Sequence, residues 1–257
     1  MTIQDRILLE ATKLIARHQR YAMDLEDRLR RIERRTLVKP NKIILTPKYW
    51  SADAGFNPYH VRSHAASISY AIQRGIAAGT YQPKPAISFE VSKEGGGTRT
   101  VSVFQVADNA VSRLVYKQLL AKNSSRLSAH CYAYRTDLTL HDAVLDVAAD
   151  LRDRKRLFVA EFDFSKYFDS ISHEHIETIL KTRRFFVTET ELRVIRAFLR
   201  APTLDEDAYT SSSKDSKPEA FHRERQFRCF SRILPLNRSI NALNAWASGS
   251  PVLLTTH

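Results

Sequence analysis

The sequence predicts a mixed α+β fold, and three observations lead to this prediction. Residues 81–104 are typical of a β-hairpin, because two β-prone runs flank three consecutive glycines. An apolar, β-prone run ends at Asp163 and indicates a buried strand. Apolar residues at helical spacing predict helices over 3–35, 61–78 and 138–152.

Composition indicates a globular, basic protein. The 257 residues are 43% hydrophobic and 10% aromatic, which is too apolar for a disordered chain, and they suffice for a sizeable core. The formal net charge of +12 favours a polyanionic partner, with nucleic acid ahead of an acidic membrane. A basic protein without such a partner is the alternative.

The cysteines and the distribution of apolar residues indicate the cellular compartment of the protein. Cys131 and Cys229 lie far apart and outside any CxxC pattern, which argues against a disulfide framework and a structural zinc site. Charged residues interrupt the first apolar run, so no signal peptide is expected. No apolar run is long enough to span a bilayer. We expect a cytoplasmic protein without a membrane partner.

Residues 1–56 are expected to form a helical N-terminal extension. Its first helix carries one apolar stripe, formed by Ile7, Leu8, Ala11, Leu14 and Ile15. Residues 24–35 are heavily charged and form either a plain solvated helix face, the preferred interpretation, or a face turned to nucleic acid. Pro40 and Pro47 then break the helix, and Asn57-Pro58 is expected to open another loop.

The predicted hairpin has one strand ending at Val91 and another over 99–104. A triple glycine at its tip requires no function, because turns use glycine for backbone freedom. Lys93 and Arg99 flank this turn, however, and could both bind one polyphosphate. Asp108 follows the hairpin, where we expect it to act as the N-cap of the next helix. Residues 119–128 are expected to form the end of that helix and a polar loop.

The strand that ends at Asp163 is followed at once by a turn and by Ser172-His-Glu-His-Ile, which is typical of a capped helix start. A strand that delivers a carboxylate to its end is a common way to hold a divalent metal ion. The alternative is an ordinary aspartate that caps the next element.

The run Asp163-Phe-Ser-Lys-Tyr-Phe168-Asp169-Ser-Ile resembles motif A of reverse transcriptases, especially the bacterial enzymes of retron, group II intron and phage-defence type. The hairpin is similar to the fingers hairpin of this family, whose lysine and arginine grip the incoming triphosphate. Lys93 and Arg99 are the matching positions. The resemblance spans roughly 57–199 and implies the fingers and a partial palm of a right-hand polymerase, with an antiparallel palm sheet packed on helices.

The resemblance also implies a chemistry, which is RNA-directed DNA polymerisation: Mg²⁺-dependent addition of deoxynucleotides to a primer 3′ end on an RNA or a DNA template. The intact family enzyme uses two Mg²⁺ ions, and the primer is DNA or RNA. Asp163 and the backbone carbonyl of Phe164 are the implied metal ligands, and Asp163 is the implied catalytic residue. Phe168 matches the aromatic gate that selects deoxynucleotides. Asp169 is expected to orient its turn.

The segment Cys131-Tyr-Ala-Tyr134-Arg135-Thr-Asp is similar to a Tyr-Arg segment that precedes motif A in the bacterial enzymes. By that similarity Tyr134 and Arg135 contact a template strand, where an aromatic ring can stack on a base. Core packing of the tyrosine with a salt bridge from the arginine is an equal alternative.

Two later parts of the family's site are absent from the chain. The family places a Pro-Gln-Gly segment and an aromatic-x-Asp-Asp hairpin after motif A, and neither is present. The aspartates after Leu204 stand in other contexts. One carboxylate does not make a two-metal site, so we predict that this chain does not polymerise.

The C-terminal region changes in character, since 225–257 contain no acidic residue. Read with a shifted frame, the codons of 219–233 permit Gly-Val/Ile-Pro-Gln-Gly-Thr-Ser-Ile-Ser-Leu-Phe-Leu-Ala-Asn, which resembles motif B of the family. The codons of Leu254-Thr255-Thr256 likewise permit Asp-Asp. We predict a frame change between about 201 and 219, so that 200–257 are a linker and a non-native tail. A genuine, divergent tail is the alternative.

Two rival functions belong to other classes. A basic protein that binds nucleic acid without catalysis would need only the net positive charge. A metal-dependent hydrolase would use Asp163 and Asp169 with His173 or His175. Solvent exposure or capping at a helix start explains these histidines as well.

Overall fold

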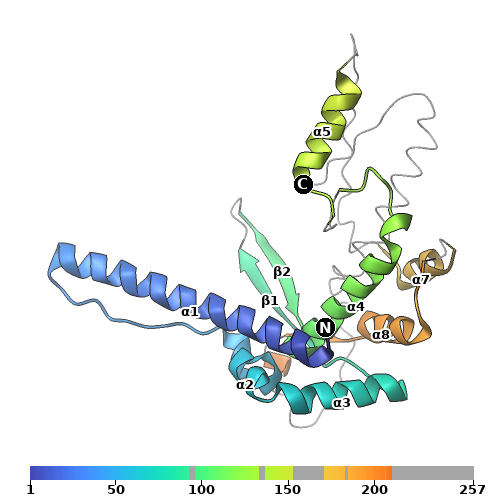
Figure 1. Cartoon of the computed structure of the whole chain (residues 1–257). Coiled ribbons are helices and arrows are strands. Elements are labelled where there is room, and N and C mark those ends of the chain that lie inside the picture. Colours follow the sequence, from blue (N-terminus) through green and yellow to red (C-terminus); the bar gives the residue numbers. More distant parts are fainter. Residues whose placement is uncertain (93–95, 133–136, 153–170, 183–184, 206, 210–257) are drawn as a thin grey trace. The chain divides into compact units, whose positions relative to one another are not determined.

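The computed structural model describes residues 1–92, 96–132, 137–152, 171–182, 185–205 and 207–209 (Figure 1). These residues form a mixed α+β fold that is mostly helical, which confirms the predicted class. They divide into two compact units. The first contains Met1–Leu114 and the described residues from Arg196 onward, and the second contains Val115–Ile195.

Helix α1, Ile3–Thr36, confirms the predicted N-terminal helix. Thr2 and Asp5 form a capping box at its start, and Leu37 ends it in the left-handed conformation at φ 56°. The predicted stripe lies against α2, α3 and the start of α4, where Ile7, Ala11 and Ile15 are buried. The buried carboxylate of Glu10 also forms ion pairs with the guanidinium groups of Arg6, at 2.9 Å, and of Arg113 in α4, at 3.2 Å.

The segment after α1 corrects one expectation. Asn57-Pro58 begins a helix and does not open a loop, because the Asn57 side chain accepts the backbone N–H groups of Tyr59 and His60 and Pro58 occupies the first helical position. The predicted helix over 61–78 is two helices that separate at His64. The elements of this region are η1 (Lys48–Ser51), η2 (Ala54–Phe56), α2 (Pro58–Ser63) and α3 (Ala65–Ala78).

The hairpin prediction is confirmed. Strand β1, Ala86–Ser92, pairs antiparallel with β2, Thr98–Val103. A third strand, β3 (Thr203–Asp205), pairs parallel with the start of β1, so the order in the sheet is β2-β1-β3. This strand comes from the range that the sequence analysis assigns to a linker. The antiparallel palm sheet expected around Asp163 lies outside the described residues.

One small aromatic core holds the sheet in place. Phe56, Ile87 and Tyr209 are buried together, and the rings of Phe56 and Tyr209 meet edge to face with their centroids 5.2 Å apart. Tyr49 stacks on Phe89 of β1 at 5.5 Å. The first unit therefore joins residues near the N-terminus, the hairpin and residues 203–209.

The remaining helices are α4 (Val106–Asn123), α5 (Leu140–Leu151), α7 (His173–Thr182) and α8 (Glu189–Leu199), with a short η3 (Ser124–Arg126) after α4. The helices predicted over 138–152 and from Ser172 are confirmed. Thr139 and Asp142 form a capping box for α5, and Ser172 Oγ accepts the backbone N–H of His175 at 3.2 Å.

Within the second unit, Asn123 ties the end of α4 to the segment before α8. Its side-chain amide donates to the Phe186 carbonyl at 3.2 Å and accepts the Phe186 N–H at 2.7 Å. Lys122 pairs with Glu191 of α8 at 2.6 Å, and Arg126 lies over the Phe186 ring at 4.2 Å.

Among the helices of the described ranges, none has an apolar stretch long enough to cross a membrane.

Candidate functional site

The β1–β2 hairpin is the described element that carries predicted site residues. Its register runs from Ile87 opposite Val103 to Ser92 opposite Thr98, so five residues, 93–97, connect the two strands in the sequence. Gly96 and Gly97 have φ values of +88° and +82°, which favour glycine, and a Cβ at either position would meet no atom within 4 Å. The glycines are therefore explained by backbone conformation, and the space beside them is open.

Of the site residues that the reverse-transcriptase resemblance implies, Arg99 alone lies in the described part, as the second residue of β2 opposite Val91. Lys93, Tyr134, Arg135, Asp163, Phe164 and Phe168 lie outside the described residues. Lys93 follows Ser92 directly in the chain. Covalent geometry alone keeps its Cα within about 7.6 Å of the Val91 Cα, because consecutive Cα atoms are about 3.8 Å apart. Lys93 and Arg99 are thus attached at the same end of the hairpin.

Asp108 fixes the start of the hairpin. The expectation that Asp108 is the N-cap of α4 is wrong. The first helical hydrogen bond of α4 runs from Asn109 to the Gln105 carbonyl, so Asp108 lies inside the first turn. Its carboxylate accepts the Tyr81 hydroxyl at 2.6 Å and the Lys84 backbone N–H at 3.0 Å. Burial raises the pKa of Asp108 to about 6 and, together with the neighbouring Asp108 charge, raises that of Tyr81 as well.

The end of the hairpin is fixed by Gln105, which follows β2 and is buried. Its side-chain amide donates to Asp53 Oδ1 at 3.0 Å and to the Tyr209 hydroxyl at 3.1 Å. Gly55 makes this contact possible, since a Cβ there would stand 2.0 Å from Gln105 Oε1. Neither residue gives a signal in the sequence pattern, because the partners of Gln105 are 52 and 104 residues away.

The side of the hairpin is fixed by β3. Ala86 N–H donates to the Pro202 carbonyl at 3.0 Å, and Ser88 Oγ donates to Asp205 Oδ1 at 2.6 Å. Together with the bonds of Asp108 and Gln105, these contacts hold the base of the hairpin at its start, at its end and along the free side of β1. Such a base can present residues at the tip without distorting when a ligand binds.

A second polar cluster lies in the other unit, just before Tyr134 in the chain. The Tyr132 hydroxyl donates to Asp146 of α5, and His130 Nδ1 lies 3.0 Å from the same carboxylate oxygen. The hydrogen bond with Asp146 raises the pKa of Tyr132 to about 12, and the bonds from Tyr132 and His130 lower the pKa of Asp146. This cluster ties the segment before Tyr134 to α5, and the sequence pattern gave no signal for it.

The structure bears on the hydrolase alternative through the two histidines. His173 and His175 both lie in the first turn of α7, two residues apart. Residues two apart project about 200° from each other around a helix axis, so only one of the two can face a given metal ion. Within the described residues, no group of three His, Cys, Asp or Glu side chains is arranged to hold a metal ion. The expected ligand Asp163 lies outside them, so the Mg²⁺ site stays a prediction.

Comparisons with known proteins give partial similarities. No family model matches the chain. The protein YkfC of Escherichia coli is 24% identical over 132 residues, which are 50% of this chain and 35% of YkfC. A COX1/OXI3 intron 1 protein of Saccharomyces cerevisiae is 26% identical over 131 residues, which are 51% of this chain and 15% of that protein. The matched region thus covers about a third and about a seventh of these relatives.

Replacing Asp108 tests the buried carboxyl. An unfolded aspartate releases its proton near pH 4, whereas the folded chain holds the proton of Asp108 up to about pH 6. The unfolded state therefore binds fewer protons between these values, and the contribution of Asp108 to the free energy of unfolding falls as the pH rises, by on the order of 1–3 kcal/mol. The Asp108→Asn variant should lack this pH-dependent contribution. Urea unfolding of both proteins at several pH values between about 4 and 6 measures the difference in the free energy of unfolding.

Asp5→Asn is the matched control, because hydrogen bonds from Thr2 lower the pKa of exposed Asp5. Its stabilising effect should therefore grow as the pH rises, which is the opposite sign. If the stability difference between wild type and Asp108→Asn does not change with pH, the carboxyl is not held as described.

Proposed function

We propose that this chain carries the fingers and the first part of the palm of a polymerase related to bacterial reverse transcriptases. In the intact enzyme, a primer 3′ hydroxyl attacks a deoxynucleoside triphosphate, with Mg²⁺ neutralising the phosphates. The observation that supports the proposal is the register of the β1–β2 hairpin, in which Arg99 lies opposite Val91, two residues before Lys93 in the chain. One cation after β1 and one near the start of β2 suit a triphosphate that enters between them.

Each residue has a distinct part in this proposal. Lys93 and Arg99 bind the triphosphate, Phe168 selects deoxynucleotides, and Tyr134 with Arg135 contacts the template. Asp163 and the Phe164 carbonyl would hold Mg²⁺, which supplies charge neutralisation and lowers the pKa of the attacking hydroxyl. The name of the yeast relative, an intron protein, supports the proposal, because group II introns are one source of the enzymes that the sequence resembles.

The second candidate is a nucleic-acid-binding protein without catalysis, which the net charge of +12 favours. It differs from the first in two measurable ways. It needs no triphosphate site at the hairpin, and its affinity for RNA does not depend on Asp163, so Asp163→Asn would leave that affinity unchanged. Both candidates share an affinity for RNA that falls steeply with salt.

Triphosphate binding separates the two candidates in the chain as it stands. We expect the 257-residue protein to bind deoxynucleoside triphosphates with Mg²⁺, and Lys93→Ala and Arg99→Ala each to weaken this binding about tenfold or more, since each removes a charge-assisted hydrogen bond. Isothermal titration calorimetry measures the affinity. Lys84→Ala is the matched control, because this exposed lysine lies at the other end of β1. Equal losses in all three variants, or no binding by the wild type, would favour the second candidate.

The second measurement concerns catalysis. We expect no templated incorporation of deoxynucleotides by the purified chain, because the Pro-Gln-Gly and Asp-Asp segments are absent. Restoring the shifted frame from about residue 219 should produce incorporation that Asp163→Ala abolishes. Incorporation by the unaltered chain that Asp163→Ala abolishes would contradict the expectation, and a neighbouring frame that does not encode Pro-Gln-Gly would remove the frame-change hypothesis.

A further inference from the structure

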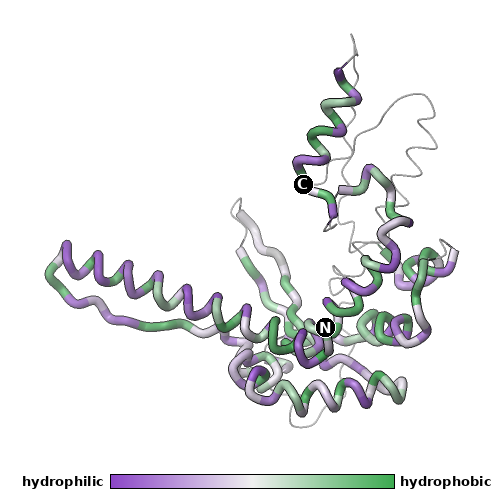
Figure 2. Tube along the Cα trace, viewed as in Figure 1, coloured by the Kyte–Doolittle hydropathy of each residue, from purple (hydrophilic) through white to green (hydrophobic). Residues whose placement is uncertain are grey.

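The second half of α1 carries more exposed positive charge than its fold requires. Every buried residue of this helix lies between Arg6 and Ile15, so residues 16–36 contribute no buried side chain. The stretch contains neither glycine nor proline and continues as regular helix to Thr36. Figures 1 and 2 show this half of α1 and its largely hydrophilic colouring.

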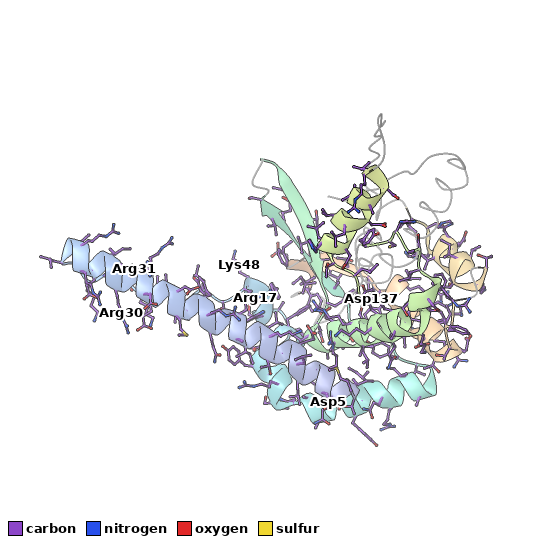
Figure 3. The ribbon with its side chains drawn as sticks, turned by 45° about the horizontal axis from the view of Figure 1, so that its top comes forward. Asp5, Arg17, Arg30, Arg31, Lys48 and Asp137 are labelled. Atoms are coloured by element: carbon purple, nitrogen blue, oxygen red, sulfur yellow. The ribbon has the colours of Figure 1, made fainter. Side chains whose placement is uncertain are left out.

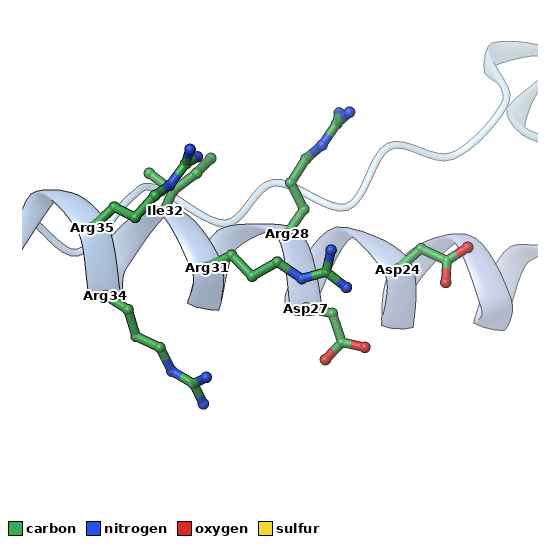
Figure 4. A pocket seen from close by; sticks show the side chains of 7 residues that line it. All are labelled: Asp24, Asp27, Arg28, Arg31, Ile32, Arg34 and Arg35. Atoms are coloured by element: carbon green, nitrogen blue, oxygen red, sulfur yellow. The ribbon is translucent and has the colours of Figure 1, made fainter.

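Five exposed arginines of this stretch lie on one face. They recur at intervals of three, four or seven to eight residues, as the 3.6-residue period requires for side chains that share a face, and we call them the arginine row: Arg17, Arg20, Arg28, Arg31 and Arg35. Figure 3 shows the side chains of Arg17 and Arg31 standing along the helix, and Figure 4 shows Arg28, Arg31 and Arg35 extending from it. The row is about 27 Å long at 1.5 Å per residue.

The row is not neutralised by the described part of the chain. None of its five members has an ion-pair partner among the described residues, whereas Arg30, on a neighbouring face, pairs with Glu26 at 3.0 Å. Asp24 is the one carboxylate within the row, and Asp27 and Arg34 flank it with opposite charges. Attraction to the negative helix end accounts for Arg34 and Arg35 in the last turn, but it does not account for Arg17, Arg20 and Arg28.

The surface has the form of an open face and not of a small-molecule pocket. The depression in Figure 4 is lined by seven residues of α1 alone, from Asp24 to Arg35. One helix cannot enclose a ligand, and a single phosphate cannot bridge arginines that are spread over about 27 Å. A double-stranded nucleic acid carries one negative charge per roughly 1.7 Å of its axis, so its backbone can contact the whole row.

The other side of this helix is occupied by the chain's own return segment, residues 37–47. Lys42 Nζ contacts Glu26 Oε2 at 2.9 Å, and His18 Nε2 lies 3.3 Å from the Leu45 carbonyl. Leu25, Leu29 and Ile32 are half-buried, and Ile32 lines the depression beside the arginines of the row. A helix that inserts into lipid needs an exposed apolar face of its own. Exposed apolar side chains near α1, such as Leu37, Ile43 and Leu45, belong to the return segment, whereas the face of α1 that carries the row is charged, which favours a nucleic-acid backbone over a membrane surface.

We propose that the arginine row of α1 is a docking surface for the phosphate backbone of a nucleic-acid duplex, separate from the hairpin. The surface reads no base sequence, because arginines spread along an exposed helix face contact phosphates and position the duplex. It requires neither Mg²⁺ nor a triphosphate. The proposal therefore stands whether the hairpin serves a polymerase or not.

The test measures binding of the 257-residue protein to a labelled 20-base-pair RNA duplex of arbitrary sequence, without Mg²⁺, over a series of salt concentrations. In the triple variant Arg28→Gln, Arg31→Gln and Arg35→Gln, we expect an affinity loss of about tenfold or more. We also expect the slope of log K against log salt to fall by about 2 to 3, one for each lost phosphate contact. Asp24→Asn should raise the affinity, because it removes the carboxylate from the row.

The control variant is Arg62→Gln, Arg74→Gln and Arg200→Gln, which removes the same three charges at exposed positions outside α1. It should retain most of the affinity, and circular dichroism should show that both triple variants are folded. Equal losses in the two triple variants would overturn the proposal, since binding would then follow net charge alone. Wild-type affinity in the row variant would overturn it too, as would binding to anionic phosphatidylserine vesicles without binding to the duplex.

Discussion

The buried carboxylate of Asp108 is the interaction on which the position of the hairpin depends. A buried, ionised carboxylate is costly unless hydrogen bonds satisfy it, and here the Tyr81 hydroxyl and the Lys84 N–H do so. Both donors belong to the segment that leads into β1, while Asp108 belongs to the first turn of α4. The bond pair thus joins the start of the hairpin to the helix that follows its end.

The other contacts of the hairpin follow from that arrangement. Asp108 fixes the start of the hairpin, Gln105 holds its end through Asp53 and Tyr209, and Ser88 joins its first strand, β1, to Asp205 of β3. The two described glycines of the tip, by contrast, have open space around them. A firmly held base with an open tip suits the proposed binding of a triphosphate, because binding residues on loops act best when a rigid scaffold positions them.

Local patterns predicted the elements whose cause is local. Apolar periodicity predicted α1, three glycines predicted the β1–β2 turn, and Ser172 predicted the start of α7. Asp108 was misjudged because a local pattern cannot show that its acceptor oxygens meet donors 24 and 27 residues away. Strand β3 was missed because three residues carry no period and their partner is more than 100 residues distant. Asn57-Pro58 suits a turn or a helix start equally, and the following residues decide between them.

The candidate sites also differ in how far the sequence alone predicts them. Motif resemblance, and not physical pattern, singled out Lys93, Arg99 and Asp163, and of these the structure describes the strand position of Arg99. The arginine row was visible as a charged helix, but a solvated face has the same pattern. The structure distinguishes a binding surface from a solvated face by showing which charges have ion-pair partners. Arg30 pairs with Glu26, whereas the arginines of the row have no ion-pair partner among the described residues.

Hydrogen exchange of the backbone amides in Tyr81→Phe tests most directly whether the Asp108 interaction fixes the hairpin. This variant removes one donor to the carboxylate without changing the size of the ring. Loss of one hydrogen bond to a charged group should raise the exchange rate of β1 and β2 amides about tenfold while α7 amides keep their wild-type rates. Unchanged exchange in β1 and β2, or an equal increase throughout the protein, would contradict the account.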